Sequence, residues 1–274
     1  MSEAAPSGQG VAVRDARRAL LERLIDHAAL FPPASLPMDA ALAADRGARA
    51  SAEAWMLGRF ICPASKLDQL PADPPRLSVV LDGEPRVDPS RLPIELVEAR
   101  GVAVERIRER FGDRVEVYVE LAPDGGLERA LEEVREAGAG AKIRCGGVTA
   151  AAFPPVEAIA RFVRSCDAAG VPWKATAGLH HPIRGVRDGL PMHGFLNLLA
   201  AAAFADTGEQ EVAAILAEED PAAFALDAGG LAVHGMRADA AALARMRAER
   251  LVAYGSCSFS EPVDDLTALG VLPL

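Results

Sequence analysis

Lysine is scarce in this chain of 274 residues. The chain has 29 lysines and arginines, of which three are lysines and the remaining 26 are arginines. These three are Lys66, Lys142 and Lys174, and the last two lie in short apolar segments typical of buried strands. Arginine stays charged in proteins, whereas a lysine can lose its proton and act as a nucleophile. Lys142 and Lys174 are therefore the first candidates for chemistry, and the alternative is that each closes a salt bridge at a strand end.

Cysteine is also sparse, and its spacing excludes several kinds of site. The four cysteines are widely separated and form no CxxC pair; they are Cys62, Cys145, Cys166 and Cys257. This spacing argues against a disulfide framework and against a structural zinc knuckle. We expect free thiols in a reducing compartment.

The chain lacks long apolar runs and a basic stripe as well. Its longest apolar run, residues 195–205, is too short to span a bilayer, and no basic-then-apolar leader opens the sequence. The formal net charge is −10, and the arginines are scattered among acidic residues. Nucleic-acid binding would need clustered positive charge. We expect a cytoplasmic protein that binds neither nucleic acid nor a membrane.

Apolar segments with strand and helix character alternate along the chain. The predicted strands are residues 24–30, 55–62, 77–81, 94–99, 115–121, the start of 138–147, 171–179 and 251–255. The predicted helices include residues 14–24, 38–49, 155–169, 196–205, 210–217 and 238–249. Eight strand–helix steps favour an α/β fold of the (β/α)8 TIM-barrel type over an open doubly wound sheet. We expect a tail at residues 1–12, one barrel domain over 13–274, and a helical insertion at about 183–237, between strands seven and eight.

The two lysine-bearing strands form a βαβ unit with the helix between them. Such strands are normally parallel and often adjacent, with backbones roughly 5 Å apart. Lys142 and Lys174 would then meet in one pocket. Two nearby ammonium groups repel, so one amine should lose its proton at lower pH and become available to form a Schiff base.

The order of short motifs resembles the deoxyribose-phosphate aldolase family, whose members are class I, Schiff-base aldolases. The segments that carry the resemblance, each followed by the family's pattern, are Ile25-Asp26-His27-Ala28 before Pro32 (Ile-Asp-His-Thr), Ile94-Glu95-Leu96-Val97 (Ile-Asp-Met-Val), Gly140-Ala141-Lys142 (Gly-Ala-Asp, an apolar residue and Lys), Lys174-Ala175-Thr176-Ala177-Gly178-Leu179 (Lys-Ala-Ser-Gly-Gly-Ile) and Gly255-Ser256-Cys257-Ser258 (Gly-Thr-Ser-Ser). The motifs keep their order over most of the chain.

The resemblance implies a lyase that makes or breaks a carbon–carbon bond through a lysine iminium. Lys142 would form the Schiff base, Lys174 would be its electrostatic partner, and Glu95 would relay protons. No cofactor is expected, and the substrate would be a small carbonyl compound bearing a phosphate or carboxylate. The residues expected to bind it are Asp26, Glu120, Arg144, Gly178, His180, His181, Gly255, Ser256 and Ser258. The insertion would cover the catalytic mouth or form an interface between identical subunits.

Two residues depart from the family's pattern. Arg144 stands where the family has small hydroxyl residues, and its guanidinium would suit a substrate that brings its own anion. Alternatively, Arg144 pairs with Glu120 or Glu95 to fill the barrel. Cys62 takes the place of an Asn near the end of the second strand.

The histidines support a rival hypothesis. His180, His181, His193 and His234, with Glu120 and Cys145, could bind a divalent metal in a metal-dependent lyase or hydrolase. No HxH or HxxxH spacing is present, however, and adjacent histidines rarely both bind one ion. The alternative is that His180 and His181 bind substrate or cap the following turn. A third hypothesis is a non-catalytic barrel that serves binding or assembly, against which the pair of strand lysines argues.

Overall fold

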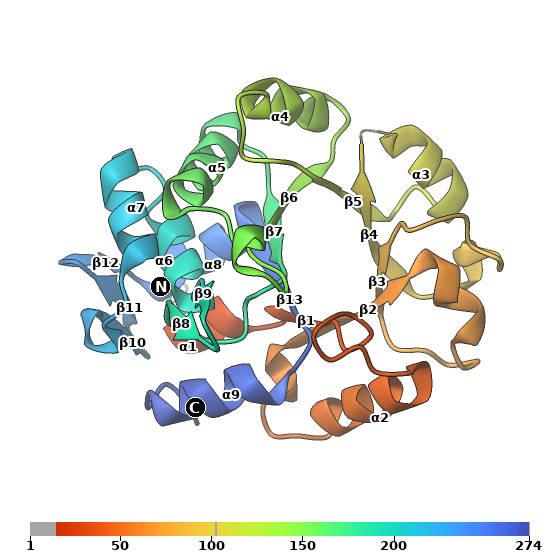
Figure 1. Cartoon of the computed structure of the whole chain (residues 1–274), viewed down its shortest axis with the longest axis horizontal. Helices are drawn as coiled ribbons and strands as arrows, with labels where there is room; N and C mark the ends of the chain where they lie inside the picture. The colour runs from red at the N-terminus through yellow and green to blue at the C-terminus, as the bar shows by residue number, and fades with distance from the viewer. Residues whose placement is uncertain (1–14, 102, 274) are drawn as a thin grey trace, which may run out of the picture.

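A closed barrel of eight parallel strands forms the centre of the molecule (Figure 1). The structure is a computed structural model and describes residues 15–101 and 103–273. The strands follow one another around the barrel in the order β1-β13-β7-β6-β5-β4-β3-β2. They are β1 (Ile25–His27), β2 (Leu57–Pro63), β3 (Leu77–Val80), β4 (Ile94–Arg100), β5 (Glu116–Glu120), β6 (Gly140–Arg144), β7 (Trp173–Thr176) and β13 (Leu251–Ser256). The predicted (β/α)8 barrel is therefore confirmed.

Helices surround the barrel, most of them in the connections between its strands (Figure 1). They are α1 (Ala16–Leu21), α2 (Met38–Arg49), α3 (Val104–Phe111), α4 (Leu127–Glu136), α5 (Val156–Ala169), α6 (Phe195–Ala203), α7 (Glu209–Ala217), α8 (Ala240–Glu249) and α9 (Ser260–Ala268). Short 3-10 turns are η1 (Ala54–Met56), η2 (Ala64–Gln69), η3 (Pro89–Arg91), η4 (Ala150–Ala152) and η5 (Pro221–Ala223). The helix α5 shows why these segments are helical: Ile159, Phe162, Val163 and Cys166 recur at helical spacing and are all buried.

Most predicted elements differ from the observed ones only at their ends. The predicted helix at 38–49 coincides with α2. The predicted strand at 24–30 is longer than β1, because the backbone of Ala28 already accepts a hydrogen bond from Phe31 in a turn. The expected tail at residues 1–12 lies outside the described residues.

The insertion between β7 and β13 is not purely helical, which corrects the prediction. Besides α6 and α7 it contains the antiparallel hairpin of β8 (Gly185–Arg187) and β9 (Leu190–Met192). A three-stranded antiparallel sheet follows, made of β10 (Phe224–Asp227), β11 (Gly230–Val233) and β12 (Met236–Ala238). Strands of three or four residues carry too few side chains to give a clear alternating pattern. The insertion lies on one side of the barrel (Figure 1).

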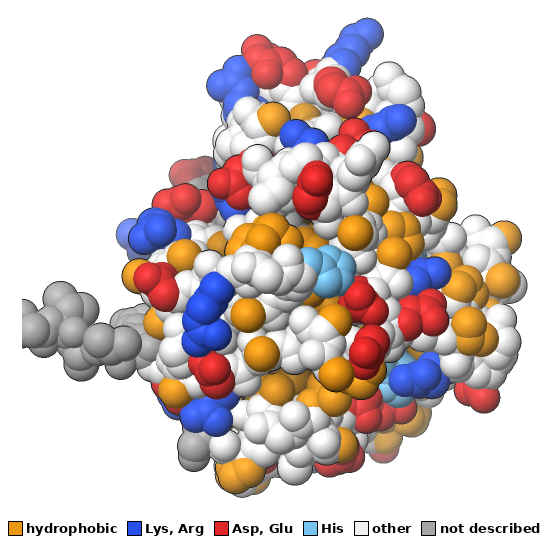
Figure 2. Space-filling view, turned by 90° about the vertical axis from the view of Figure 1, so that its left-hand side faces the viewer, with side chains coloured by type: hydrophobic (Ala, Val, Ile, Leu, Met, Phe, Trp, Pro, Cys, Tyr) orange, Lys and Arg blue, Asp and Glu red, His pale blue; other side chains and the backbone are white. Residues whose placement is uncertain are grey.

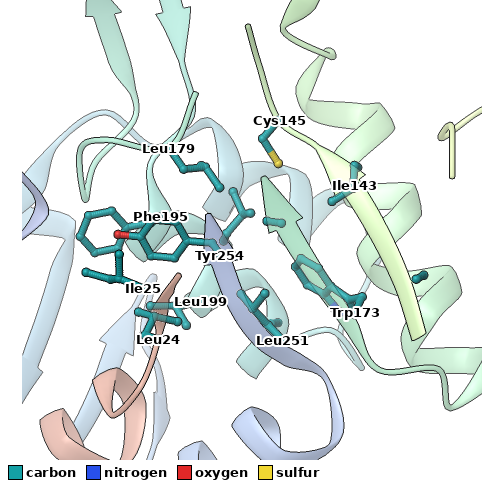
Figure 3. Packing of buried hydrophobic residues seen from close by; sticks show 14 of the residues in the cluster. Leu24, Ile25, Ile143, Cys145, Trp173, Leu179, Phe195, Leu199, Leu251 and Tyr254 are labelled. Carbon is teal, nitrogen blue, oxygen red and sulfur yellow. The ribbon is translucent and has the colours of Figure 1, made fainter. Parts of the chain in front are cut away.

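The main apolar core lies between the barrel strands and the surrounding helices (Figure 3). The ring of Tyr254 on β13 stacks on Phe195 of α6, with ring centroids 5.2 Å apart. Trp173 on β7 meets Phe162 of α5 edge to face at 5.6 Å. Side chains alternate along each strand, so the neighbours of these core residues point to the barrel interior. Ile143 belongs to the core, and the adjacent Lys142 does not.

The surface that Figure 2 shows has acidic and basic side chains interspersed with small apolar patches. Charge of one sign is not gathered on this face into a broad area. Among the described helices, none is both long and apolar enough to cross a membrane.

Candidate active site

Lys142 and Lys174 are direct partners across the neighbouring strands β6 and β7. The strands of the two lysines are therefore neighbours, as predicted, but Lys142 lines a cavity and Lys174 does not, so the two amines do not share one pocket. Both side chains are buried, with 4% of Lys142 and none of Lys174 exposed. The carboxylate of Glu98 on β4 joins them: its Oε1 accepts a hydrogen bond from Lys174 Nζ at 2.7 Å, and its Oε2 lies 2.8 Å from Lys142 Nζ. The repulsion expected between the two amines is thus offset by a shared anion.

Lys174 has a second anionic partner, Asp26 on β1, whose Oδ2 lies 2.8 Å from Nζ. Burial by itself would lower the pKa of Lys174, but the charges of Asp26 and Glu98 outweigh it and hold the pKa above its ordinary value. Lys174 is therefore a permanent ammonium ion at neutral pH. Asp26 is completely buried and also accepts the backbone N–H of Arg59. Asp26 therefore holds Lys174 in place instead of binding substrate, which corrects the role predicted for it.

Glu98 was not among the site residues predicted from the sequence. Burial would raise its pKa, but the charges of Lys174 and Lys142 prevail and hold the pKa well below its usual range. The hydroxyl of Ser78 also donates to its Oε1 at 2.8 Å. Val97 and Ala99 belong to the outer core, so the acidic residue between them faces the barrel interior. The sequence signal for Glu98 was an acidic residue within an otherwise apolar strand segment.

Glu95, predicted to be the catalytic acid, lies at the start of β4, away from the two lysines. Its carboxylate pairs with Arg23 at 2.7 Å, Arg59 at 3.0 Å and Arg76 at 3.7 Å. The start of a barrel strand is at the opposite end from the usual catalytic face. The motif match placed the acid three residues too early, and Glu98 takes the position assigned to Glu95.

Together these residues form a chain of alternating charges through the barrel. In order from the carboxyl ends of the strands it consists of Glu120, Lys142, Glu98, Lys174, Asp26, Arg59 and Glu95. Arg59 makes the longest of these approaches, 3.9 Å from Asp26. Each internal member therefore has an oppositely charged group on both sides, as buried charges require.

A cavity of about 840 Å³ opens at the carboxyl ends of the barrel strands. Lys142 and Glu98 lie on its wall, whereas Lys174 and Asp26 are not among its lining residues. Glu120 also lines the cavity, with Oε2 at 3.0 Å from Lys142 Nζ and Oε1 at 3.4 Å from Arg100. The amine best placed to meet a ligand is therefore that of Lys142.

Much of the remaining cavity wall is apolar. It is formed by Phe31, Pro32, Pro33, Ile61 and Leu81 of the barrel loops and strands, with Leu190 and Met192 from the hairpin. The insertion thus contributes directly to the cavity. A ligand would meet charged side chains at the ends of β3 to β6, among them Asp82 and Arg100, and an apolar surface on the side of the hairpin.

Arg144 lies at the end of β6, exposed to solvent and on the cavity wall. Glu120 pairs with Lys142 and Arg100, and Glu95 is at the other end of the barrel. Among the described residues, Arg144 forms no ion pair, so the alternative of a structural pair is not supported. Its guanidinium is available to an anionic ligand.

The glycines and serines predicted to bind substrate separate into two groups. Gly178 and Gly255 line the cavity. A Cβ on Gly178, at φ 70°, would come within 2.8 Å of the Phe153 ring, so the loop requires glycine there. Ser256 is buried and accepts a bond from the backbone of Ser258, whose own hydroxyl accepts the backbone N–H of Glu261 near the start of α9. These two serines stabilise the turn into α9 and are not part of the cavity wall.

The histidines that the metal hypothesis requires pair with separate partners. His180 Nδ1 lies 3.0 Å from Glu261, and His181 Nδ1 lies 2.6 Å from Asp265. Of these two, His180 lines the cavity and His181 does not, which corrects the binding role predicted for His181. The other two histidines also have carboxylate or backbone partners: His234 lies 2.9 Å from Glu218, and His193 donates from Nε2 to the Pro154 carbonyl at 2.8 Å.

Burial lowers the pKa of His193 to about 4, and Arg184 donates to its Nδ1. Cys145 is buried, and burial raises the pKa of its thiol to about 12; the same holds for Cys62. Within residues 15–101 and 103–273, no group of three or more His, Cys, Asp or Glu side chains is placed to hold a metal ion. The histidines, Glu120 and Cys145 of the metal hypothesis therefore do not form a common metal site among the described residues.

The fold and this cluster define a (β/α)8 barrel with a buried, carboxylate-bridged lysine pair below a cavity. Comparison with protein-family models and with curated proteins finds no match.

Proposed function

We propose that this protein is a class I, Schiff-base lyase, similar to aldolases. The observation that carries the proposal is that Lys142 lies on the cavity wall, while the permanently charged Lys174 lies behind it and shares Glu98. A lysine amine held in this way can react with a carbonyl group, whereas the positive charge of Lys174 stays in the barrel. The resemblance to deoxyribose-phosphate aldolases supports the same chemistry.

In the proposed reaction the neutral amine of Lys142 attacks the carbonyl carbon of the substrate. This amine forms when the Lys142 ammonium gives up one proton; that proton and a second one from the same nitrogen leave with the carbonyl oxygen as water. The resulting iminium withdraws electrons from the neighbouring carbon, so that a carbon–carbon bond to it can break or form. The iminium carries one positive charge, as the ammonium of Lys142 does. Glu98 and Glu120 already lie within 3.0 Å of this nitrogen, so they would stabilise the iminium without rearrangement.

The guanidinium of Arg144 on the cavity wall favours a substrate with an anionic group. Arg144 reaches the cavity next to Lys142 on the same strand face and has no described acidic partner. A guanidinium can bind a carboxylate or phosphate through two parallel hydrogen bonds. The proposed substrate is therefore a small carbonyl compound with a carboxylate or phosphate near the reacting carbon.

Borohydride trapping tests this proposal directly. The protein would be incubated with pyruvate, dihydroxyacetone phosphate, acetaldehyde or propanal, reduced, digested and mapped by mass spectrometry. We expect at least one compound to label Lys142, and we expect Lys66, in the turn η2 outside the cavity, to remain unmodified. Labelling of Lys174 would reverse the roles of the two lysines. Absence of label on both lysines with all four compounds would contradict the proposal.

A further inference from the structure

His180 and Glu261 form a hydrogen-bonded pair at the edge of the cavity. His180 follows β7, and its Nδ1 lies 3.0 Å from the Oε2 of Glu261 on α9. His180 is 8% exposed and lines the cavity that also contains Lys142. With Nδ1 bonded to a carboxylate, the tautomer is fixed and Nε2 is left to exchange a proton.

Within the described residues, the hydrogen-bonding neighbour of Nε2 is the Cys257 sulfur, 3.9 Å away. This distance is too long for a strong bond. Burial raises the pKa of the Cys257 thiol, so the sulfur is protonated at neutral pH and does not compete as a base. Cys257 and Glu261 are the titratable groups that contact the ring from the segment after β13 and from α9.

The carboxylates beside Lys142 are poorly suited to move protons on and off carbon. Both oxygens of Glu98 are bonded to lysines, and the positive charges hold its pKa well below the usual range. Such a carboxylate is a weak base. Glu120 is the competing candidate, although it is engaged with Lys142 and Arg100. Imidazole is the side chain that exchanges protons most readily near neutral pH.

We propose that His180, held in orientation by Glu261, transfers the proton at the carbon next to the iminium carbon. This inference rests on the proposed Schiff-base function. In the forward step the C–H bond breaks, its electron pair forms the enamine C=C bond, and the π pair of the iminium moves to the Lys142 nitrogen. The proton goes to Nε2 of the neutral imidazole, and Glu261 balances the charge of the imidazolium. The reverse step returns the proton to carbon. His180 is thus a catalytic residue and Glu261 a positioning residue.

Deuterium exchange separates this step from imine formation. In D2O, the methyl protons of pyruvate should exchange through the enamine, and one-dimensional NMR would follow their loss, with propanal as a neutral second probe. His180→Asn keeps a donor close to the Nδ1 position and removes Nε2. We expect exchange to fall by roughly 100-fold or more, while borohydride still traps the same compound on Lys142. The retained trapping also shows that the variant is folded.

The neighbouring histidine provides a matched control. His181 is adjacent in the chain and bonds Asp265 on the same helix, but it is not on the cavity wall. His181→Asn should therefore leave exchange unchanged. If His181→Asn reduced exchange as much as His180→Asn, the effect would come from detaching α9, and the inference would be wrong.

Glu261 tests the positioning role. Gln at this position can still accept the Nδ1 hydrogen, whereas Ala cannot, so Glu261→Gln should retain much of the exchange that Glu261→Ala loses. If His180→Asn were still trapped by borohydride and its exchange rate were unchanged, the role of His180 would be wrong while the proposed Schiff-base function would stand. Loss of exchange in Glu120→Gln would then identify Glu120 as the base. Absence of trapping in the unaltered protein with pyruvate and propanal would overturn the inference for both probes. If dihydroxyacetone phosphate and acetaldehyde also gave no trapped adduct, the proposed Schiff-base function would be wrong as well.

Discussion

The amines of Lys142 and Lys174 are held by opposite oxygens of one carboxylate, that of Glu98. The two lysines are partners in register on neighbouring strands, yet their environments differ. Lys142 reaches the cavity wall, and Lys174 is enclosed between Glu98 and Asp26. This difference agrees with the proposed roles, in which Lys142 reacts and Lys174 stays charged.

Replacing the reactive amine should abolish imine formation and leave the fold intact. Lys142→Arg keeps a positive charge beside Glu98 and Glu120, but a guanidinium does not act as a nucleophilic amine. We expect no borohydride adduct, and a free energy of unfolding lowered by no more than about 3 kcal/mol, because the larger guanidinium enters a buried position. Lys66→Arg, outside the cavity, is the matched control and should be labelled normally. An adduct that persists in Lys142→Arg would mean that another lysine reacts.

Two isosteric changes on β4 should differ in their effect on stability. Glu98→Gln removes a buried anion shared by two lysines, and we expect it to lower the free energy of unfolding by about 3–5 kcal/mol. Glu95→Gln acts on a carboxylate whose side chain is 32% exposed, so its cost should be about 1 kcal/mol or less. Urea unfolding at pH 7 measures both. An equal decrease in the free energy of unfolding for both variants would show that the bridge from Glu98 to the two lysines contributes no more to stability than the ion pairs of Glu95.

His193 should make stability depend on pH in the weakly acidic range. Burial holds its pKa at about 4 in the folded protein, against 6.5 for an ordinary histidine. Because the folded-state pKa is the lower one, the stabilisation is complete above pH 6.5 and is lost as the pH falls towards 4. Between pH 7.5 and pH 5 this amounts to about 2 kcal/mol.

The comparison variant for this effect is His193→Gln, since the Gln amide can still donate to the Pro154 carbonyl. Urea unfolding of both proteins at the two pH values isolates the contribution of this one histidine from that of the others. We expect the original protein to lose more stability than the variant on acidification. Parallel losses would contradict the assignment.

Arg144 should determine the preference for anionic substrates. Arg144→Lys keeps the charge but cannot form the two parallel hydrogen bonds of a guanidinium, so half-saturation of trapping by pyruvate should need about tenfold more compound. Propanal carries no anion and should be trapped as before. A similar change for both compounds would indicate that Arg144 acts on the reactive amine instead of on the substrate.

The barrel and its lysine pair could be predicted because their signals are local and regular. Apolar strands alternate with amphipathic helices, and the βαβ connection places Lys142 beside Lys174. Glu98 could not be chosen over Glu95 from a four-residue motif, since both lie on the same strand. The different roles of Glu95 and Glu98 depend on which end of the barrel each residue lies at and on whether its side chain faces the barrel interior.

The site residues after β7 and β13 were harder to predict, because their roles depend on contacts between distant segments. His180 and His181 are adjacent, but only a helix more than 80 residues away fixes their partners, Glu261 and Asp265. Ser258 stands in a motif that suggests anion binding and instead stabilises the start of α9. The short strands of the insertion likewise depend on pairing with one another, which composition does not reveal.

The chain of alternating charges from Glu120 to Glu95 limits how this barrel can be altered by design or by mutation. Changing one internal member, such as Asp26, leaves the opposite charge on each side with one partner fewer in a buried place. Effects of changes at neighbouring positions should then be strongly non-additive. We expect the protein to tolerate the replacement of an acid and its basic partner together better than the replacement of either one alone. Removing both members of a pair leaves no additional unpaired charge in the barrel interior.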